Sequence, residues 1–115
     1  MISSDLLTAL LQFRQKRNWE QFHKPKELAV TLSVEAGELL ELFQWKTNEE
    51  VAAMLDSTLK ERVADEVADV VIVLSYLCHD LNIDLNAAVR SKLEKNEARY
   101  PVHKVYGSSK KYDEH

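Results

Sequence analysis

The chain has 115 residues, of which 45% are hydrophobic and 30% are charged. This balance predicts a single folded domain, residues 1–115, because it supplies enough apolar surface to offset the entropy that a chain loses on ordering. A formal net charge of −4 disfavours a protein that binds along a nucleic-acid backbone, which needs a surplus of Lys and Arg. One cysteine excludes an intrachain disulfide, and two glycines with two prolines provide few of the turn residues that sheets need.

The first half of the chain predicts three helices. Leucines at mixed three- and four-residue spacing indicate a helix over residues 5–18. An irregular connector follows, and Pro25 suits the first turn of a second helix, over residues 25–46. The motif Thr47-x-x-Glu50 has the form of a capping box and predicts a short helix that ends near residue 55.

The second half predicts two further helices. The motif Thr58-x-x-Glu61 opens a helix that reaches residue 81. Its centre, residues 70–74, is mostly β-branched and also suits a buried strand, but helical spacing persists for about twenty positions, and length favours the helix. Asn82 ends this helix and Asp84 caps the next, which covers residues 85–99 before Pro101. The polar tail, residues 102–115, is expected to be partly loose. The fold class predicted is an all-α helical bundle of four main helices plus a short one.

No export signal or membrane anchor is expected. The N-terminal residues show no basic leader before an apolar run. The most apolar stretch, residues 67–77, contains Asp69 and is far shorter than the roughly 20 residues of a membrane span. We therefore expect a cytoplasmic protein whose partners include neither membrane nor nucleic acid.

Two short acidic motifs, Glu35-x-x-Glu38 and Glu66-x-x-Asp69, lie 31 residues apart, each within an apolar helix. At about 100° per residue, both pairs fall on the same flank of the apolar stripe of their helix. The first stripe comprises Leu28, Leu32, Ala36, Leu39, Leu40 and Phe43, and the second comprises Val63, Val67, Val70, Leu74 and Leu77. Further along, Leu42 and Trp45 follow the first motif as Val73 and Tyr76 follow the second. The two helices are therefore pseudo-repeats.

This repeat predicts a metal site. Antiparallel packing about an approximate two-fold axis brings the four carboxylates around one point beside the core. Like charges so close cost several kcal/mol, and bound divalent cations relieve that cost more simply than protonation does. Ligation by oxygen alone favours Mg²⁺ or Mn²⁺ over zinc, and Glu38 and Asp69 stand where a di-iron bundle has histidines. The alternative is that both motifs are ordinary solvent-facing helix surface.

Two further groups suit phosphate and base contacts. One face of the last helix carries residues at i, i+3, i+4 and i+7 that can hold a polyphosphate: Lys92, Lys95, Asn96 and Arg99. The same face also suits an ordinary charged helix surface. Three aromatic residues are candidates for stacking on a nucleobase, an interaction worth roughly 1–3 kcal/mol, although such residues also occur in cores: Trp19, Phe22 and Trp45.

The carboxylate quartet with its flanking strings resembles the signature of the all-α MazG-like nucleotide pyrophosphohydrolases. The strings at residues 18–23, 38–45 and 99–103 are similar to the dCTP pyrophosphatase subgroup of that family, including its vertebrate members. The resemblance covers nearly the whole chain. One position departs from the pattern, because Val73 stands where the subgroup often has a tyrosine that lines the site.

The resemblance implies an enzyme that hydrolyses a nucleoside triphosphate, most often dCTP or a related deoxynucleotide, to the monophosphate and pyrophosphate as a house-cleaning activity. The residues that match the metal ligands of the family are Glu35, Glu38, Glu66 and Asp69. Lys92 and Asn96 match positions that contact phosphate or sugar, and Trp19 and Trp45 match aromatics that line the base pocket.

The mechanism expected is in-line attack of water on the α-phosphorus, assisted by Mg²⁺, with pyrophosphate as the leaving group. Glu35 or Glu38 takes the proton of the water. The cations of the last helix, Lys92, Lys95 and Arg99, offset charge on the departing phosphates.

Self-association is also expected. The helix that carries Glu66 is apolar nearly all round, with Ile72 opposite its main stripe, so it needs cover on both sides. We expect a homodimer or homotetramer, which the resemblance also implies. The rival interpretation is a non-catalytic helical oligomeric interaction module with the carboxylates at its surface, and metal dependence separates the two.

Overall fold

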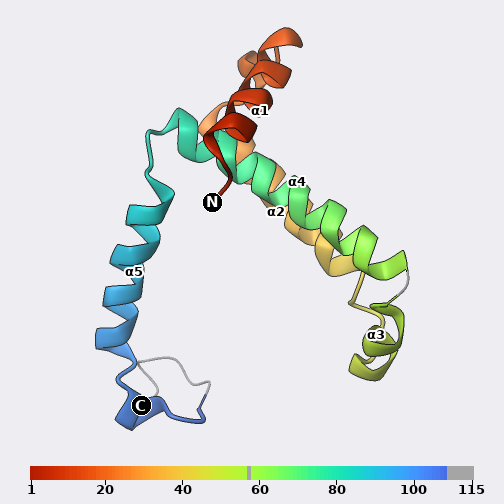
Figure 1. The fold of residues 1–115 in the computed structure, drawn as a ribbon, viewed down its shortest axis with the longest axis vertical. Coiled ribbons are helices and arrows are strands. Elements are labelled where there is room, and N and C mark those ends of the chain that lie inside the picture. Colours follow the sequence, from red (N-terminus) through yellow and green to blue (C-terminus); the bar gives the residue numbers. More distant parts are fainter. Residues whose placement is uncertain (57, 109–115) are drawn as a thin grey trace. The chain divides into compact units, whose positions relative to one another are not determined.

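The computed structural model describes residues 1–56 and 58–108. Over these residues the chain is helical and has no strand, which confirms the all-α class (Figure 1). In order, the elements are α1 (Ser4–Lys16), the 3-10 helix η1 (Glu20–Phe22), α2 (Pro25–Glu41), α3 (Asn48–Met54), α4 (Thr58–Asp80), α5 (Leu85–Arg99) and α6 (Val102–Val105). Residues 70–74, which also suited a strand, lie inside α4. None of the helices in the described part is long and apolar enough to cross a membrane.

The chain comprises two compact units, one over Ile2–Asn82 and one made of Met1 and the residues from Ile83 onward. In the first unit α2 and α4 pack side by side, and α1 and α3 contact α4 near its opposite ends (Figure 1). The second unit contains α5 and α6. The interpretation of residues 1–115 as one domain stays a prediction.

The ends of the helices follow local capping chemistry. The capping box at Thr47 is confirmed in both directions, since its hydroxyl accepts from Glu50 N–H at 3.1 Å and the Glu50 carboxylate accepts from Thr47 N–H at 3.3 Å. Asn82 has a positive φ of 55° and ends the turn after α4. Asp84 then caps α5, with its carboxylate 3.1 Å from Ala87 N. These three predictions required only the residues next to each helix end.

Two helices end earlier than the sequence predicts. α1 ends at Lys16 in a Schellman motif, in which Asn18 has φ 53° and the N–H of Trp19 donates to Arg14 C=O at 3.2 Å. α2 ends at Glu41, where the backbone tightens into short turns and the Lys46 ammonium donates to Leu42 C=O at 2.9 Å. The side-chain bond satisfies a carbonyl that a continuing helix would have used.

The C-terminal tail begins with a helix. Within the predicted tail, residues 102–115, α6 (Val102–Val105) follows Pro101, and the partly loose character of the tail stays a prediction. Residues 109–115 lie outside the described residues.

The buried face of α2 is rotated from the predicted stripe. Leu28 and Leu42 are 2% and 6% exposed, whereas Leu40 is 57% exposed and Ala36 is also exposed. At about 100° per residue, Leu28 and Leu42 lie within about 20° of Glu35. The contact face therefore centres on the Glu35 carboxylate, whereas the apolar residues alone predict that Glu35 lies on the flank of the stripe.

Burial follows the 31-residue repeat. Leu28 and its equivalent Leu59 are the most buried side chains of the described residues, at 2% and 1% exposed. The equivalents Leu42 and Val73 are also both buried. The symmetry breaks at the last pair, because Tyr76 is buried while Trp45 is 85% exposed. The phenol of Tyr76 lies under α1 and donates to Leu10 C=O at 2.9 Å.

α1 supplies part of the apolar cover that the sequence of α4 predicts from a second copy of the chain. Leu28, Val73 and Tyr76 form the core cluster, and Leu10 and Leu11 of α1 pack against it together with Ile72 of α4. Ile72 is thus partly buried within the chain. Other apolar positions on α2 and α4 stay exposed, namely Val30, Val34 and Val67.

Candidate functional site

The four predicted carboxylates meet between α2 and α4. One oxygen from each side chain lies within 4.8 Å of the equivalent oxygens of the other three: Glu35, Glu38, Glu66 and Asp69. The glutamates are half-buried and Asp69 is exposed, so the cluster opens to solvent on the side of Asp69. The convergence follows from the repeat, because equivalent positions on two antiparallel helices face each other at the middle of the pair.

The cluster is electrostatically strained without a cation. Burial raises the pKa of Glu35 first, and its hydrogen bond with Glu38 and the charge of that carboxylate raise it further. The pKa of Glu66 is raised as well, chiefly by burial and then by the charges of Glu38 and Asp69. Both shifts mean that the site resists carrying its full negative charge.

Two oxygens of the cluster have no hydrogen-bond partner among the described residues. Oε2 of Glu35 and Oε2 of Glu66 are buried and accept no hydrogen bond from the described residues. Glu35 and Glu66 are equivalent in the repeat, so each of the two helices contributes one buried oxygen that lacks a hydrogen-bond donor. A buried acceptor without a donor is costly, and a cation supplies what both lack. The all-oxygen donor set therefore fits a hard divalent cation such as Mg²⁺ or Mn²⁺.

The two candidate tryptophans do not come together within one chain. Trp19 precedes α2 and is 42% exposed, whereas Trp45 follows α2 and is 85% exposed. α2 has 17 residues and is about 25 Å long at about 1.5 Å per residue. A single base is too small to contact both rings of one copy. Phe22, the third aromatic candidate, is 63% exposed in η1.

The candidate phosphate face lies on α5, in the second unit. Its residues keep the helical spacing that the sequence predicts, and all but the half-buried Asn96 are exposed: Lys92, Lys95, Asn96 and Arg99. Val73, the position at which the subgroup often has a tyrosine, is 8% exposed in the core cluster beside Leu28. A buried valine at this place contributes packing and no polar group.

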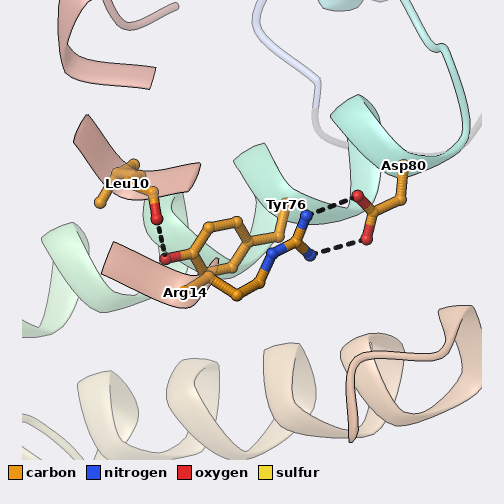
Figure 2. Close-up of polar contacts among 4 residues, drawn as sticks. All are labelled: Leu10, Arg14, Tyr76 and Asp80. Carbon is orange, nitrogen blue, oxygen red and sulfur yellow. Dashed lines mark hydrogen bonds and ion pairs between the residues drawn. The ribbon is translucent and has the colours of Figure 1, made fainter. Parts of the chain in front are cut away.

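Sequence reasoning missed one polar network. Arg14 of α1 is 5% exposed and donates two hydrogen bonds, each of 2.8 Å, to the carboxylate of Asp80 on α4 (Figure 2). The Arg14 guanidinium also lies 4.6 Å from the centre of the Tyr76 ring. The Asp80 hydrogen bond raises the pKa of Arg14 and lowers the pKa of Asp80. Arg14 and Asp80 are 66 positions apart in the sequence, and no local sequence motif predicts that they form an ion pair.

Comparison with known proteins identifies the family. The MazG-like family profile matches residues 30–114, which include the whole quartet. The chain belongs to the MazG-like family. Among MazG-like relatives, dCTP pyrophosphatase 1 of Homo sapiens is 46% identical over 105 residues, or 90% of this chain and 61% of that protein. The protein of the same name from Rattus norvegicus is 46% identical over 103 residues, or 88% of this chain and 60% of that protein. The chain thus spans about three fifths of the length of these relatives.

A solved structure agrees with this assignment. The crystal structure of a pyrophosphatase from Archaeoglobus fulgidus matches with a TM-score of 0.79 at 45% identity, covering 84% of this chain and 90% of that one. Similarity at this level confirms the predicted MazG-like all-α fold.

Proposed function

We propose that the chain is a nucleoside triphosphate pyrophosphohydrolase that uses Mg²⁺, or Mn²⁺ in its place, and releases pyrophosphate and a monophosphate. The observation that carries the proposal is the convergence of four carboxylates within 4.8 Å in a MazG-like fold, where two of the carboxylates have a buried oxygen that no described residue contacts by a hydrogen bond. The similarity to the dCTP pyrophosphatases supports dCTP or a related deoxynucleotide as the substrate and a nucleotide-pool house-cleaning role.

Each group of residues has a role in this proposal. Glu35, Glu38, Glu66 and Asp69 hold the cation, which when bound polarises phosphate oxygens and offsets their charge. Glu35 or Glu38 accepts the proton of the attacking water, and the raised pKa of Glu35 suits that carboxylate to the task. The exposed cations of α5 stabilise charge on the leaving pyrophosphate, and Asn96 contacts phosphate or sugar.

The two tryptophans support a homo-oligomer. If Trp19 and Trp45 both contact one base, they must come from two copies, because α2 separates them within one chain. The exposed Val30, Val34 and Val67 provide apolar surface for such an interface. The homodimer or homotetramer and the cytoplasmic location remain predictions. Mixing Trp19→Ala with Trp45→Ala chains tests the oligomer. Mixed oligomers would contain some base sites with both tryptophans intact and would regain activity, whereas oligomers of one variant would not.

The experiment for the proposed activity compares two glutamates of one helix. Pyrophosphate release from dCTP and from the other common ribo- and deoxynucleotides is measured with Mg²⁺ and with a chelator. Glu38→Gln is expected to lose most activity, and the matched control Glu41→Gln, exposed on α2 and outside the quartet, should keep it. Parental turnover by Glu38→Gln would remove this site from consideration, and no pyrophosphate from any nucleotide would favour the non-catalytic interaction module.

A further inference from the structure

Trp19 is tied to the end of α1. Its backbone N–H donates to Arg14 C=O at 3.2 Å, and Asn18 N–H donates to Gln15 C=O at 3.0 Å, which are the two bonds of the Schellman motif. The indole packs edge-on against Phe13, with ring centres 5.7 Å apart. The Trp19 backbone and ring therefore follow wherever α1 is placed.

α1 is in turn tied to α4 by the side chain of Arg14. The planar guanidinium makes a two-pronged contact with the Asp80 carboxylate, and Figure 2 shows both bonds. A fork of this kind fixes direction as well as distance. Arg14 is the point at which both connections meet, because its carbonyl holds Trp19 and its guanidinium holds α4.

Stability alone accounts poorly for this arrangement. A buried ion pair costs desolvation of both partners, and apolar residues of similar size often stabilise a protein equally well or better. Leu10 and Leu11 already attach α1 to the core cluster through apolar contact. What the Arg14 fork adds is a single register of α1 on α4.

We propose that Arg14 is a positioning residue for the substrate: it fixes the place of Trp19 relative to α4, the helix that carries Glu66 and Asp69, and thereby sets where the base is bound. The inference rests on the proposed function, in which Trp19 contacts the base. Arg14 itself touches no substrate. It acts through Trp19, so its effect depends on the indole being present.

A double-mutant cycle tests that dependence. Arg14→Met keeps an unbranched side chain and removes the fork, so KM for dCTP is expected to rise about fivefold or more while kcat changes little, the range that loss of base stacking gives. In a Trp19→Ala background, Arg14→Met should change KM no further. An equal rise in KM in both backgrounds would overturn the proposal. Asp80→Asn provides a second route, because it weakens the fork from the other side and should reproduce the KM effect if Arg14→Met folds poorly.

Two controls separate positioning from stability and from the proposed activity. Tyr76→Phe removes the bond to Leu10 C=O and leaves the fork, so it should lower the melting temperature without raising KM. In a Trp45→Phe background the emission reports Trp19 alone, since the chain has two tryptophans. Arg14→Met should then increase quenching of Trp19 by acrylamide. Unchanged quenching would contradict the proposal, whereas a wild-type protein that releases no pyrophosphate would contradict only the proposed function.

Discussion

Replacing Glu35 by Gln should stabilise the protein when metal is absent. The Glu35 carboxylate has an oxygen within 4.8 Å of three other carboxylate oxygens. At that distance two unit charges repel by about 1 kcal/mol in water-like surroundings and by several times that at lower dielectric. Because the cluster opens to solvent at Asp69, the smaller repulsion applies to each of the three pairs that Glu35 forms with the other carboxylates. Partial protonation lowers the sum, so Glu35→Gln should raise the free energy of unfolding by on the order of 1–3 kcal/mol.

The direction of the pH dependence follows from the same charges. The pKa values of Glu35 and Glu66 are raised in the folded chain, so the folded state binds more protons than the unfolded state above the ordinary glutamate pKa. The free energy of unfolding of the metal-free protein should therefore fall as the pH rises from that value through the raised pKa values. Mg²⁺ should cancel the fall, because it offsets the charge that causes it.

Thermal melting in a chelator measures the effect. A gain of 1 kcal/mol corresponds to about 4–8 °C for a unit of about 60–100 residues, so Glu35→Gln should melt several degrees above the wild type. Added Mg²⁺ should raise the wild-type melting temperature and raise that of Glu35→Gln much less. The control Glu41→Gln should melt at nearly the wild-type temperature both in chelator and with Mg²⁺, because an exposed substitution changes the free energy of unfolding by no more than about 0.5 kcal/mol. A metal-free Glu35→Gln protein that melts at or below the wild-type temperature would refute the reasoning.

Three further predictions follow from burial and charge. Leu28→Ala should lower the free energy of unfolding, measured in urea, by about 2–5 kcal/mol, and so should its repeat equivalent Leu59→Ala. Leu40→Ala should cost far less, because Leu40 is 57% exposed. Equal losses at all three positions would contradict the observed burial of Leu28 and Leu59. Burial and the Arg14 charge lower the pKa of His23. The contribution of His23 to the free energy of unfolding should therefore be complete above about pH 6.5 and decline as the pH falls below that value. A His23→Phe protein that shows the same decline in denaturant titrations would exclude His23 as the cause. Lys92→Ala should raise KM for the nucleotide and leave Mn²⁺ affinity unchanged, with exposed Lys26→Ala as the control, and an unchanged KM would remove α5 from phosphate binding.

The helices and the quartet could be predicted because their signals are local or repeated. Thr47 and Asp84 act on N–H groups three residues away, and that spacing is visible in the sequence. The carboxylates could be paired because Glu35 and Glu66 occupy equivalent positions in two similar helices. A duplicated pattern gives the register of two helices without any need to compute their packing.

The rest depends on contacts that the sequence does not encode locally. The apolar residues of α2 predict a stripe with Glu35 on its flank, whereas Glu35 lies at the centre of the buried face. The bond between Arg14 and Asp80 joins residues 66 positions apart, and its partners look like ordinary surface charges until α1 is placed on α4. The distance between Trp19 and Trp45 likewise follows from the length of α2 and its ends.

Binding of Mn²⁺ tests the central claim most directly. Electron paramagnetic resonance detects free Mn²⁺ and so gives the amount bound to wild-type protein and to the variants Glu35→Gln, Glu66→Gln and Glu41→Gln. The account predicts that the wild type and Glu41→Gln bind Mn²⁺ alike, that each quartet variant binds much more weakly, and that Mg²⁺ competes. Equal binding by all four proteins, or none by the wild type, would contradict the claim that these four carboxylates share a divalent cation.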